Sequence, residues 1–178
     1  SRYFNREGRY GEGGAYRDPN SPYRSWYDFD SKYKGGYRSW WGFETLPEVN
    51  EETPSYVEFI TGEGGVIDTW LRRGAAGFRL DVADELPDEF IEKVRTAVKR
   101  VGPDKFLLGE VWEDATTKFG FDKRRTYLLG KGLDSVMNYP FKNAVLGFVC
   151  GQDAGQTMTD ILSICEHYPA PALDTALN

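Results

Sequence analysis

The sequence predicts an α/β protein in which short parallel strands are joined by helices. Two apolar runs, residues 77–81 and 106–110, each end in a carboxylate. Between them, Asp88–Val101 has apolar residues at helical spacing, which indicates an amphipathic helix. A strand, a helix and a second strand in this order require a right-handed crossover, which makes the two strands parallel. Asp81 and Glu110 are therefore expected side by side at one edge of a sheet.

The first 53 residues differ from the rest in composition. Thirteen of the chain's 27 aromatic residues fall between Tyr3 and Phe43, among many Gly, Asp, Arg and Pro residues. Turn signals such as Gly35-Gly36 interrupt this stretch, and few apolar residues repeat at either period. We therefore predict a loop-rich domain over residues 1–53, held together by packed aromatic rings, and a domain of regular α/β structure over residues 54–178.

Helix signals open the second domain. Thr53-Pro54 is typical of a helix start, with proline at the first helical position. Gly64-Gly65 predicts an interruption before the helix resumes at residues 66–71, and Gly74 is a suitable C-terminal cap. The strand at residues 77–81 follows.

Beyond Glu110 the alternation of strands and helices continues. It predicts a short helix near residues 123–129, a strand over 133–138, helices over 140–149 and 153–166, and an approach to a further strand over 172–178. Successive strand ends are separated by about one strand–helix unit, which suits a (β/α)8 barrel and a doubly wound sheet alike.

Two carboxylates at one sheet edge could divide the work of glycoside hydrolysis, one as nucleophile and one as acid/base. Arg79 lies two residues before Asp81 on the same strand, so both point to one face, and the guanidinium would keep the aspartate ionised. Val111 and Trp112 follow Glu110, and an apolar wall of this kind would raise its pKa. The pattern suggests Asp81 as nucleophile and Glu110 as acid/base.

The runs GFRLD and GEVWED resemble two motifs of the α-amylase family of glycoside hydrolases, and LPEVN resembles a third. Longer stretches such as SWWGFETLPEVN and LDSVMNYPF are most similar to the neopullulanase, cyclomaltodextrinase and maltogenic amylase branch. The resemblance implies a partial (β/α)8 TIM barrel, about strands 4 to 6 with their helices, preceded by the loop-rich insert domain. It also implies Asp81 as nucleophile, Glu110 as acid/base and Arg79 as the arginine that orients the nucleophile.

Further substrate contacts are expected near the carboxylates. Asp84 and Glu85 occupy positions where the cyclomaltodextrinase branch tends to carry Asn-Glu, and their loop would line the acceptor side of the cleft. Their alternative role is to provide N-terminal charges for the helix that follows Pro87. Trp112 could form the floor of an acceptor subsite or support Glu110 from behind.

In the aromatic domain, Trp40, Trp41 and Tyr37 are the best candidates for rings that stack on sugar. Packing in the core is the alternative for each of them.

A complete (β/α)8 barrel needs about 250 residues, and this chain has 178. The family's first and last motifs are absent, and the last one carries the third catalytic carboxylate. We therefore expect an internal segment of a longer enzyme, inactive by itself. No metal site or cofactor is expected within the chain, although calcium in the parent enzyme stays open.

The leading functional hypothesis is hydrolysis of α-1,4-linked glucans such as cyclodextrin, pullulan or maltodextrin by the parent, with transglycosylation as a second reaction. The alternatives are a glucosidase specific for α-1,6 oligosaccharides on the same scaffold and a non-catalytic carbohydrate-binding module. The presence of Arg79, Asp81 and Glu110 favours an enzyme.

Composition excludes other classes. A net charge of −6 argues against a nucleic-acid partner, and no apolar run approaches the ~18 residues of a membrane span. Cys150 and Cys165 are too few for a disulfide framework and are expected to be buried or half-buried thiols, whereas His167 is expected at the surface. The location stays open between cytoplasmic and secreted, with the cytoplasm preferred. Whether the parent enzyme is a dimer also stays open.

Overall fold

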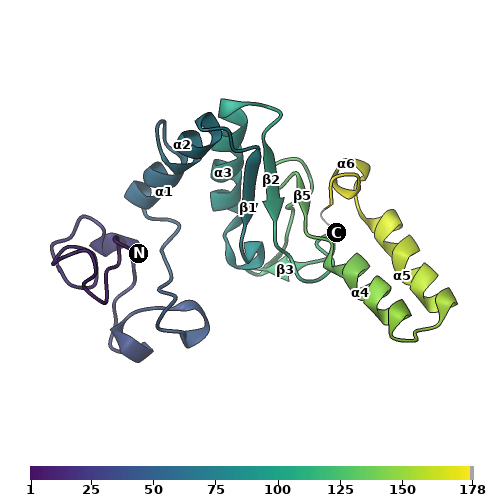
Figure 1. Cartoon of the computed structure of the whole chain (residues 1–178), viewed down its shortest axis with the longest axis horizontal. Coiled ribbons are helices and arrows are strands. Elements are labelled where there is room, and N and C mark those ends of the chain that lie inside the picture. The colour runs from purple at the N-terminus through teal and green to yellow at the C-terminus, as the bar shows by residue number, and fades with distance from the viewer. Residues whose placement is uncertain (177–178) are drawn as a thin grey trace. The chain divides into compact units, whose positions relative to one another are not determined.

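The computed structural model describes residues 1–176 and divides the chain into two compact units (Figure 1). The first unit is Ser1–Phe59, and the second begins at Ile60. The division falls six residues later than the expected one because Tyr56 and Phe59 pack against the aromatic core of the first unit. Among the described residues, no helix has the length and apolar character needed to cross a membrane.

The first unit is irregular. Its backbone forms three short 3-10 turns, Arg24–Trp26 (η1), Lys34–Gly36 (η2) and Trp40–Gly42 (η3), and two isolated antiparallel bridges. A cluster of buried side chains holds it together: Phe4, Ala15, Trp26, Tyr27 and Tyr37. The Phe4 ring lies 4.7 Å from Tyr37 and 4.8 Å from Tyr27 between centroids. Ring packing, rather than strand pairing, therefore organises this segment.

A parallel sheet lies at the centre of the second unit (Figure 1). Its strands are β1 (Gly77–Leu80), β2 (Phe106–Gly109) and β5 (Ser135–Val136), in the order β1-β2-β5. In the register of β1 and β2, Leu80 pairs with Gly109, so the next residue of each chain segment is a carboxylate. The predicted parallel pair with matched carboxylates is confirmed.

The described part of the chain contains six α-helices. They are α1 (Pro54–Thr61), α2 (Val66–Arg72), α3 (Asp88–Val101), α4 (Tyr139–Val149), α5 (Ala154–His167) and α6 (Ala170–Leu173). Of these, α1 crosses the boundary between the two units. The predicted break between α1 and α2 is present, and Gly64 there has φ +74°, a conformation that favours glycine. The amphipathic α3 buries Phe90, Ile91, Val94, Ala97 and Val98 and packs against α2 and β2.

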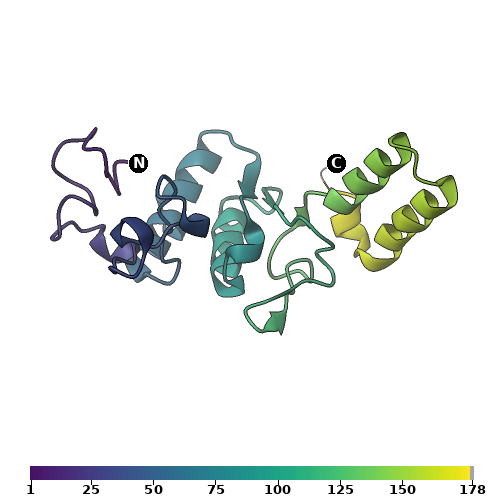
Figure 2. The same ribbon diagram turned by 90° about the horizontal axis from the view of Figure 1, so that it is seen from below.

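Helices α4 and α5 lie side by side, as both Figure 1 and Figure 2 show. Side chains cap both N-termini: Asn138 accepts from the Phe141 N–H, and Asp153 accepts from the Gln156 N–H. Cys150 and Cys165 are both exposed, so the expectation of buried thiols is wrong. Cys150 is the C-cap of α4 and Cys165 lies in α5, two helices that bury few of their side chains.

The helix predicted near residues 123–129 is absent. Instead, β3 (Phe119–Gly120) pairs antiparallel with β4 (Lys123–Arg124). The two residues of the turn, Phe121 and Asp122, have φ +53° and +58°, as a two-residue hairpin requires. The strand predicted over residues 133–138 is reduced to β5. The expected approach to a further strand over 172–178 is not seen in α6, and residues 177–178 lie outside the described part.

Asp134 fixes the position of β5 in the sheet. Its backbone N–H donates to the Leu107 carbonyl (2.9 Å), and its carboxylate accepts from the Leu107 N–H (2.8 Å). The same carboxylate pairs with Arg95 (2.7 Å) and Lys99 (2.8 Å) of α3. A single side chain thereby links two strands and the helix that covers them.

Candidate active site

Arg79, Asp81 and Glu110 meet at the ends of β1 and β2. The Arg79 guanidinium donates a hydrogen bond to Asp81 Oδ1, and its Nη2 lies 2.8 Å from Glu110 Oε1. One cation thus bridges the two carboxylates. This convergence follows from the strand register, because residues that end adjacent parallel strands reach the same edge of the sheet.

The two carboxylates differ strongly in exposure. The Asp81 side chain is 77 % exposed, whereas that of Glu110 is 10 % exposed. A solvent-open carboxylate that is paired with a guanidinium can act as a nucleophile, and an enclosed one can hold or accept a proton. The geometry therefore gives the two groups different environments.

Four groups bind the Glu110 carboxylate. The Val82 N–H donates to Oε2 (2.9 Å) and the Tyr139 hydroxyl donates to Oε1 (3.1 Å). The Trp112 side chain also hydrogen-bonds it, and Arg79 supplies the positive charge. Burial alone would raise the pKa of Glu110, but these hydrogen bonds and the charge outweigh burial and lower it.

The expectation of a raised Glu110 pKa is therefore wrong. It treated Trp112 as an apolar wall, whereas the indole is a hydrogen-bond donor and stabilises the ionised carboxylate. The Trp112 side chain contacts Glu110, which agrees with the expected role of supporting that residue. Trp112 is also 38 % exposed, so part of its surface is accessible to solvent.

Sequence reasoning missed Val82 and Tyr139. Tyr139 follows the end of the third parallel strand, β5, so the strand-end argument that identified Asp81 and Glu110 could have found it. Val82 has left-handed backbone angles (φ +45°, ψ +51°), which are rare for a β-branched residue and carry no sequence signal.

Asp84 and Glu85 lie in the loop after Asp81, in the 3-10 turn Ala83–Glu85 (η4). The Asp84 carboxylate pairs with Lys118 (2.9 Å) and accepts from the Tyr127 hydroxyl (3.0 Å), while Glu85 is exposed. α3 begins at Asp88, as expected, and the acidic residues of its first turn are Asp88 and Glu89, whereas Asp84 and Glu85 precede it in η4.

The aromatic candidates belong to the first unit. The Trp40 and Trp41 rings stack with centroids 5.0 Å apart and planes 16° apart, and Trp41 is 67 % exposed. Tyr37 is completely buried, and its hydroxyl donates to the Glu44 carbonyl (2.5 Å) and accepts from Arg6 (2.9 Å). Tyr37 is therefore a core residue and is removed from the set of sugar-contacting rings.

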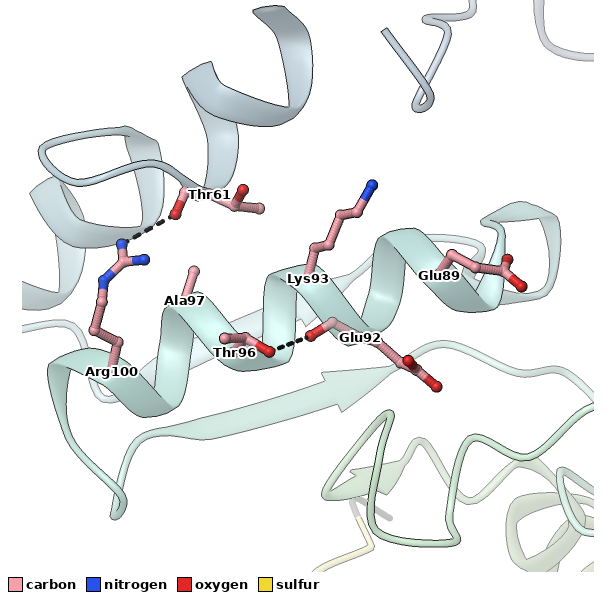
Figure 3. A pocket seen from close by; sticks show the side chains of 7 residues that line it. All are labelled: Thr61, Glu89, Glu92, Lys93, Thr96, Ala97 and Arg100. Carbon is pink, nitrogen blue, oxygen red and sulfur yellow. Dashed lines mark hydrogen bonds between the residues drawn. The ribbon is translucent and has the colours of Figure 1, made fainter. Parts of the chain in front are cut away.

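Outside the carboxylate pair, the described residues provide no metal site but line a hollow beside α3. No group of three or more His, Cys, Asp or Glu residues in residues 1–176 could hold a metal ion. A hollow of about 390 Å³ lies on the polar side of α3, where Arg100 donates to the Thr61 carbonyl at 3.0 Å (Figure 3). It is lined by Thr61, Glu89, Glu92, Lys93, Thr96, Ala97 and Arg100 and contains no residue of the candidate site.

Comparison with known proteins gives one consistent result. The family described as the alpha amylase catalytic domain matches residues 3–169. The amylopullulanase of Thermoanaerobacterium saccharolyticum is 33 % identical over an alignment of 207 positions, gaps included, that covers 99 % of this chain and 15 % of that protein. A cyclomaltodextrinase of a Bacillus species is 40 % identical over 114 residues, which cover 63 % of this chain and 18 % of that protein.

Solved structures agree. Ttha1563 from Thermus thermophilus superposes with a TM-score of 0.75 at 31 % identity, covering 89 % of this chain and 36 % of that one. The cyclic α-maltosyl-(1→6)-maltose hydrolase of Arthrobacter globiformis in complex with maltose gives a TM-score of 0.74 at 25 % identity. This match covers 88 % of this chain and 35 % of that one. The chain spans a minor part of each of these relatives. With the family match over residues 3–169 and the paired carboxylates at the strand ends, the chain belongs to the α-amylase catalytic-domain family.

Proposed function

We propose that this chain supplies the nucleophile and the acid/base of a retaining glycoside hydrolase that cleaves α-1,4-linked glucans. The observation that carries the proposal is the Arg79 guanidinium, which bridges Asp81 and Glu110 at the ends of two parallel strands. Relatives named amylopullulanase, cyclomaltodextrinase and neopullulanase support cyclodextrin, pullulan or maltodextrin as substrates. Transglycosylation would follow if a sugar hydroxyl replaced water.

The reaction has two displacements. An Asp81 oxygen attacks the anomeric carbon while the bond to the leaving oxygen breaks, and the Glu110 carboxyl gives its proton to that oxygen. Glu110 then takes a proton from water, the water oxygen attacks the same carbon, and the bond to Asp81 breaks. Two inversions give retention. In a complete barrel the carboxyl groups should lie about 5–5.5 Å apart.

The lowered Glu110 pKa suits the second step, in which this group is a base. For the first step it must hold a proton. We expect a bound glucan to displace Arg79 or Tyr139 from Oε1, because both stabilise the ionised form. Loss of either contact raises the pKa of Glu110 and prepares it as an acid.

Other residues have supporting roles in this proposal. Glu85 and the exposed edge of Trp112 would contact the acceptor sugars, and Asp84 would act through Lys118 and Tyr127 as a structural member of the same loop. Residues 1–53 would form the domain inserted in the barrel, with the stacked Trp40 and Trp41 as its sugar-binding surface. No step of the proposed chemistry requires a cofactor.

The test uses the protein that carries the complete barrel. Its rates on β-cyclodextrin, pullulan, maltodextrin and isomaltose are compared, and the anomer of the first product is read by NMR. Turnover of the first three with an α-anomeric product is expected. Turnover of isomaltose alone would favour the α-1,6 glucosidase, and glucan binding by calorimetry without turnover would favour a non-catalytic module.

Trp41→Ala should weaken the binding of maltoheptaose to the chain roughly twofold to twelvefold, since a ring contact of this kind is worth about 0.5–1.5 kcal/mol. Isothermal calorimetry measures the effect. Trp70→Ala is the matched control, because Trp70 of α2 is also a largely exposed tryptophan (53 %). Equal losses in both variants would contradict a specific role for Trp41.

A further inference from the structure

Arg125, directly after β4, is a cation in an unusual position. Its side chain has no solvent exposure, whereas arginine is rarely buried completely. Its Nε donates to Asp88 Oδ1, its Nη1 to the Asp84 carbonyl and its Nη2 to the Leu86 carbonyl, each at 2.7 Å. The Asp84 and Leu86 carbonyls belong to the segment that joins Asp81 to α3, and Asp88 is the first residue of α3. The guanidinium thus occupies a built site made from this loop and the start of the helix that follows it.

Two rings enclose the same guanidinium. Its central carbon lies 4.3 Å from the centroid of the Tyr127 ring and 5.1 Å from that of Phe121. Both rings come from the β3–β4 hairpin and its continuation, so the hairpin presents Arg125 to the loop in one orientation. A lysine could not replace it fully, because an ammonium lacks the planar fork that reaches three fixed oxygens.

The opposite end of this loop binds the acid/base candidate. The Val82 N–H donates to Glu110 Oε2 and the Ala83 N–H donates to the Glu110 carbonyl, both at 2.9 Å. Val82 holds left-handed backbone angles, which are strained for a β-branched residue and persist only where the surroundings impose them. Something beyond the loop itself must therefore hold Val82 in place.

We propose that Arg125 is a positioning residue: it clamps the loop after the nucleophile and so keeps the Val82 N–H directed at the Glu110 carboxylate. The catalytic consequence of this inference rests on the proposed function, whereas the structural role of Arg125 in holding the loop does not. Lys118 and Tyr127, from the same stretch of chain as Arg125, bind the Asp84 carboxylate and secure the loop at a second point.

Hydrogen–deuterium exchange on the full chain tests the clamp without any assay of activity. In Arg125→Gln, we expect the Val82 and Ala83 amides to exchange at least tenfold faster than in the wild type, while the Leu107–Gly109 amides of β2 keep their protection. Arg125→Lys should give an intermediate rate. Arg124→Gln is the matched control, since the exposed Arg124 side chain donates to the Thr116 carbonyl and not to the loop. In this variant the exchange rates of the Val82 and Ala83 amides should stay within twofold of the wild type.

Unchanged Val82 and Ala83 exchange in both Arg125 variants would overturn the proposal. If Arg125→Gln unfolds the chain, β2 protection is lost as well, and Arg125→Lys then decides the matter: faster exchange confined to the loop supports the clamp, and wild-type exchange refutes it.

The catalytic arm uses the protein with the complete barrel. The Val82 N–H stabilises ionised Glu110, so its loss raises the pKa of that carboxyl, and the limb of the kcat/KM profile set by Glu110 should move to higher pH. Arg79 and Tyr139, which also face Glu110, are unchanged in the variant. We expect Arg125→Lys to lower kcat several-fold with little change in KM. If Arg125→Lys changes the exchange of the loop amides but the wild-type enzyme has no activity, the proposed function is wrong and the clamp stands. If the wild type is active and the pH profile of Arg125→Lys does not move, the positioning role is wrong.

Discussion

Replacing Glu110 by Gln should lower kcat on maltodextrin by about 10²–10⁴-fold, the usual contribution of a positioned acid/base. The variant is measured in the protein with the complete barrel. A carboxamide keeps the shape of Glu110, which binds Arg79 and Tyr139, but it can neither deliver nor accept the proton. An aryl glucoside with a nitrophenolate leaving group needs no protonation, so its first displacement should remain fast. A burst of nitrophenol and a covalent glycosyl adduct visible by intact mass are expected.

Asp81→Asn should abolish turnover of both substrates without a burst or an adduct, because no nucleophile remains to attack the anomeric carbon. Glu113→Gln is the control, since Glu113 is three residues from Glu110 and its side chain is largely exposed at 62 %. If Glu110→Gln formed no adduct and lost equal activity on both substrates, the assignment of the two roles would be wrong.

Asp134→Ala should destabilise the second unit by about 1–3 kcal/mol, because it leaves part-buried hydrogen-bond donors without their acceptor. The Asp134 side chain is 16 % exposed and serves Arg95, Lys99 and the Leu107 N–H together. Its loss leaves two cations and a strand amide without this acceptor. Urea unfolding of the full chain, followed by circular dichroism, measures the change. Asp104→Ala, at an exposed aspartate in the turn before β2, should have little effect.

Acid should remove the contribution of Asp134. Burial alone would raise its pKa, but Lys99, Arg95 and the Leu107 N–H lower it below the usual value. A carboxyl whose pKa is lower in the folded state stabilises the protein fully above the unfolded pKa of about 3.9, and this contribution disappears as pH falls through the folded pKa. The stability difference between the wild type and Asp134→Ala should therefore be largest near neutral pH and shrink below about pH 4. A difference independent of pH would mean that the charge of Asp134 does not stabilise the sheet.

The identity of the candidate site could be predicted from the sequence because its elements are local. Each strand is a short apolar run that ends in a carboxylate, and α3 is marked by its own periodicity. A parallel pair in register then brings Asp81 and Glu110 together, with Arg79 on the same face of β1. These steps need only backbone geometry and the alternation of side chains.

Side-chain contacts between distant parts of the chain could be found only in the tertiary structure. Tyr37 is buried because Phe4, some thirty residues earlier, packs on its ring. The pKa of Glu110 is lowered because Tyr139 and the backbone of Val82 reach its two oxygens.

The hairpin that carries Arg125 depends on positive φ angles at Phe121 and Asp122, which nothing in their residue types demands. The sequence by itself determined which residues stand at the strand ends and therefore the class of chemistry. The tertiary structure decided the direction in which the pKa of Glu110 moves, the exposure of both carboxylates and what holds them in place, because these properties depend on groups that the order of residues alone does not bring together.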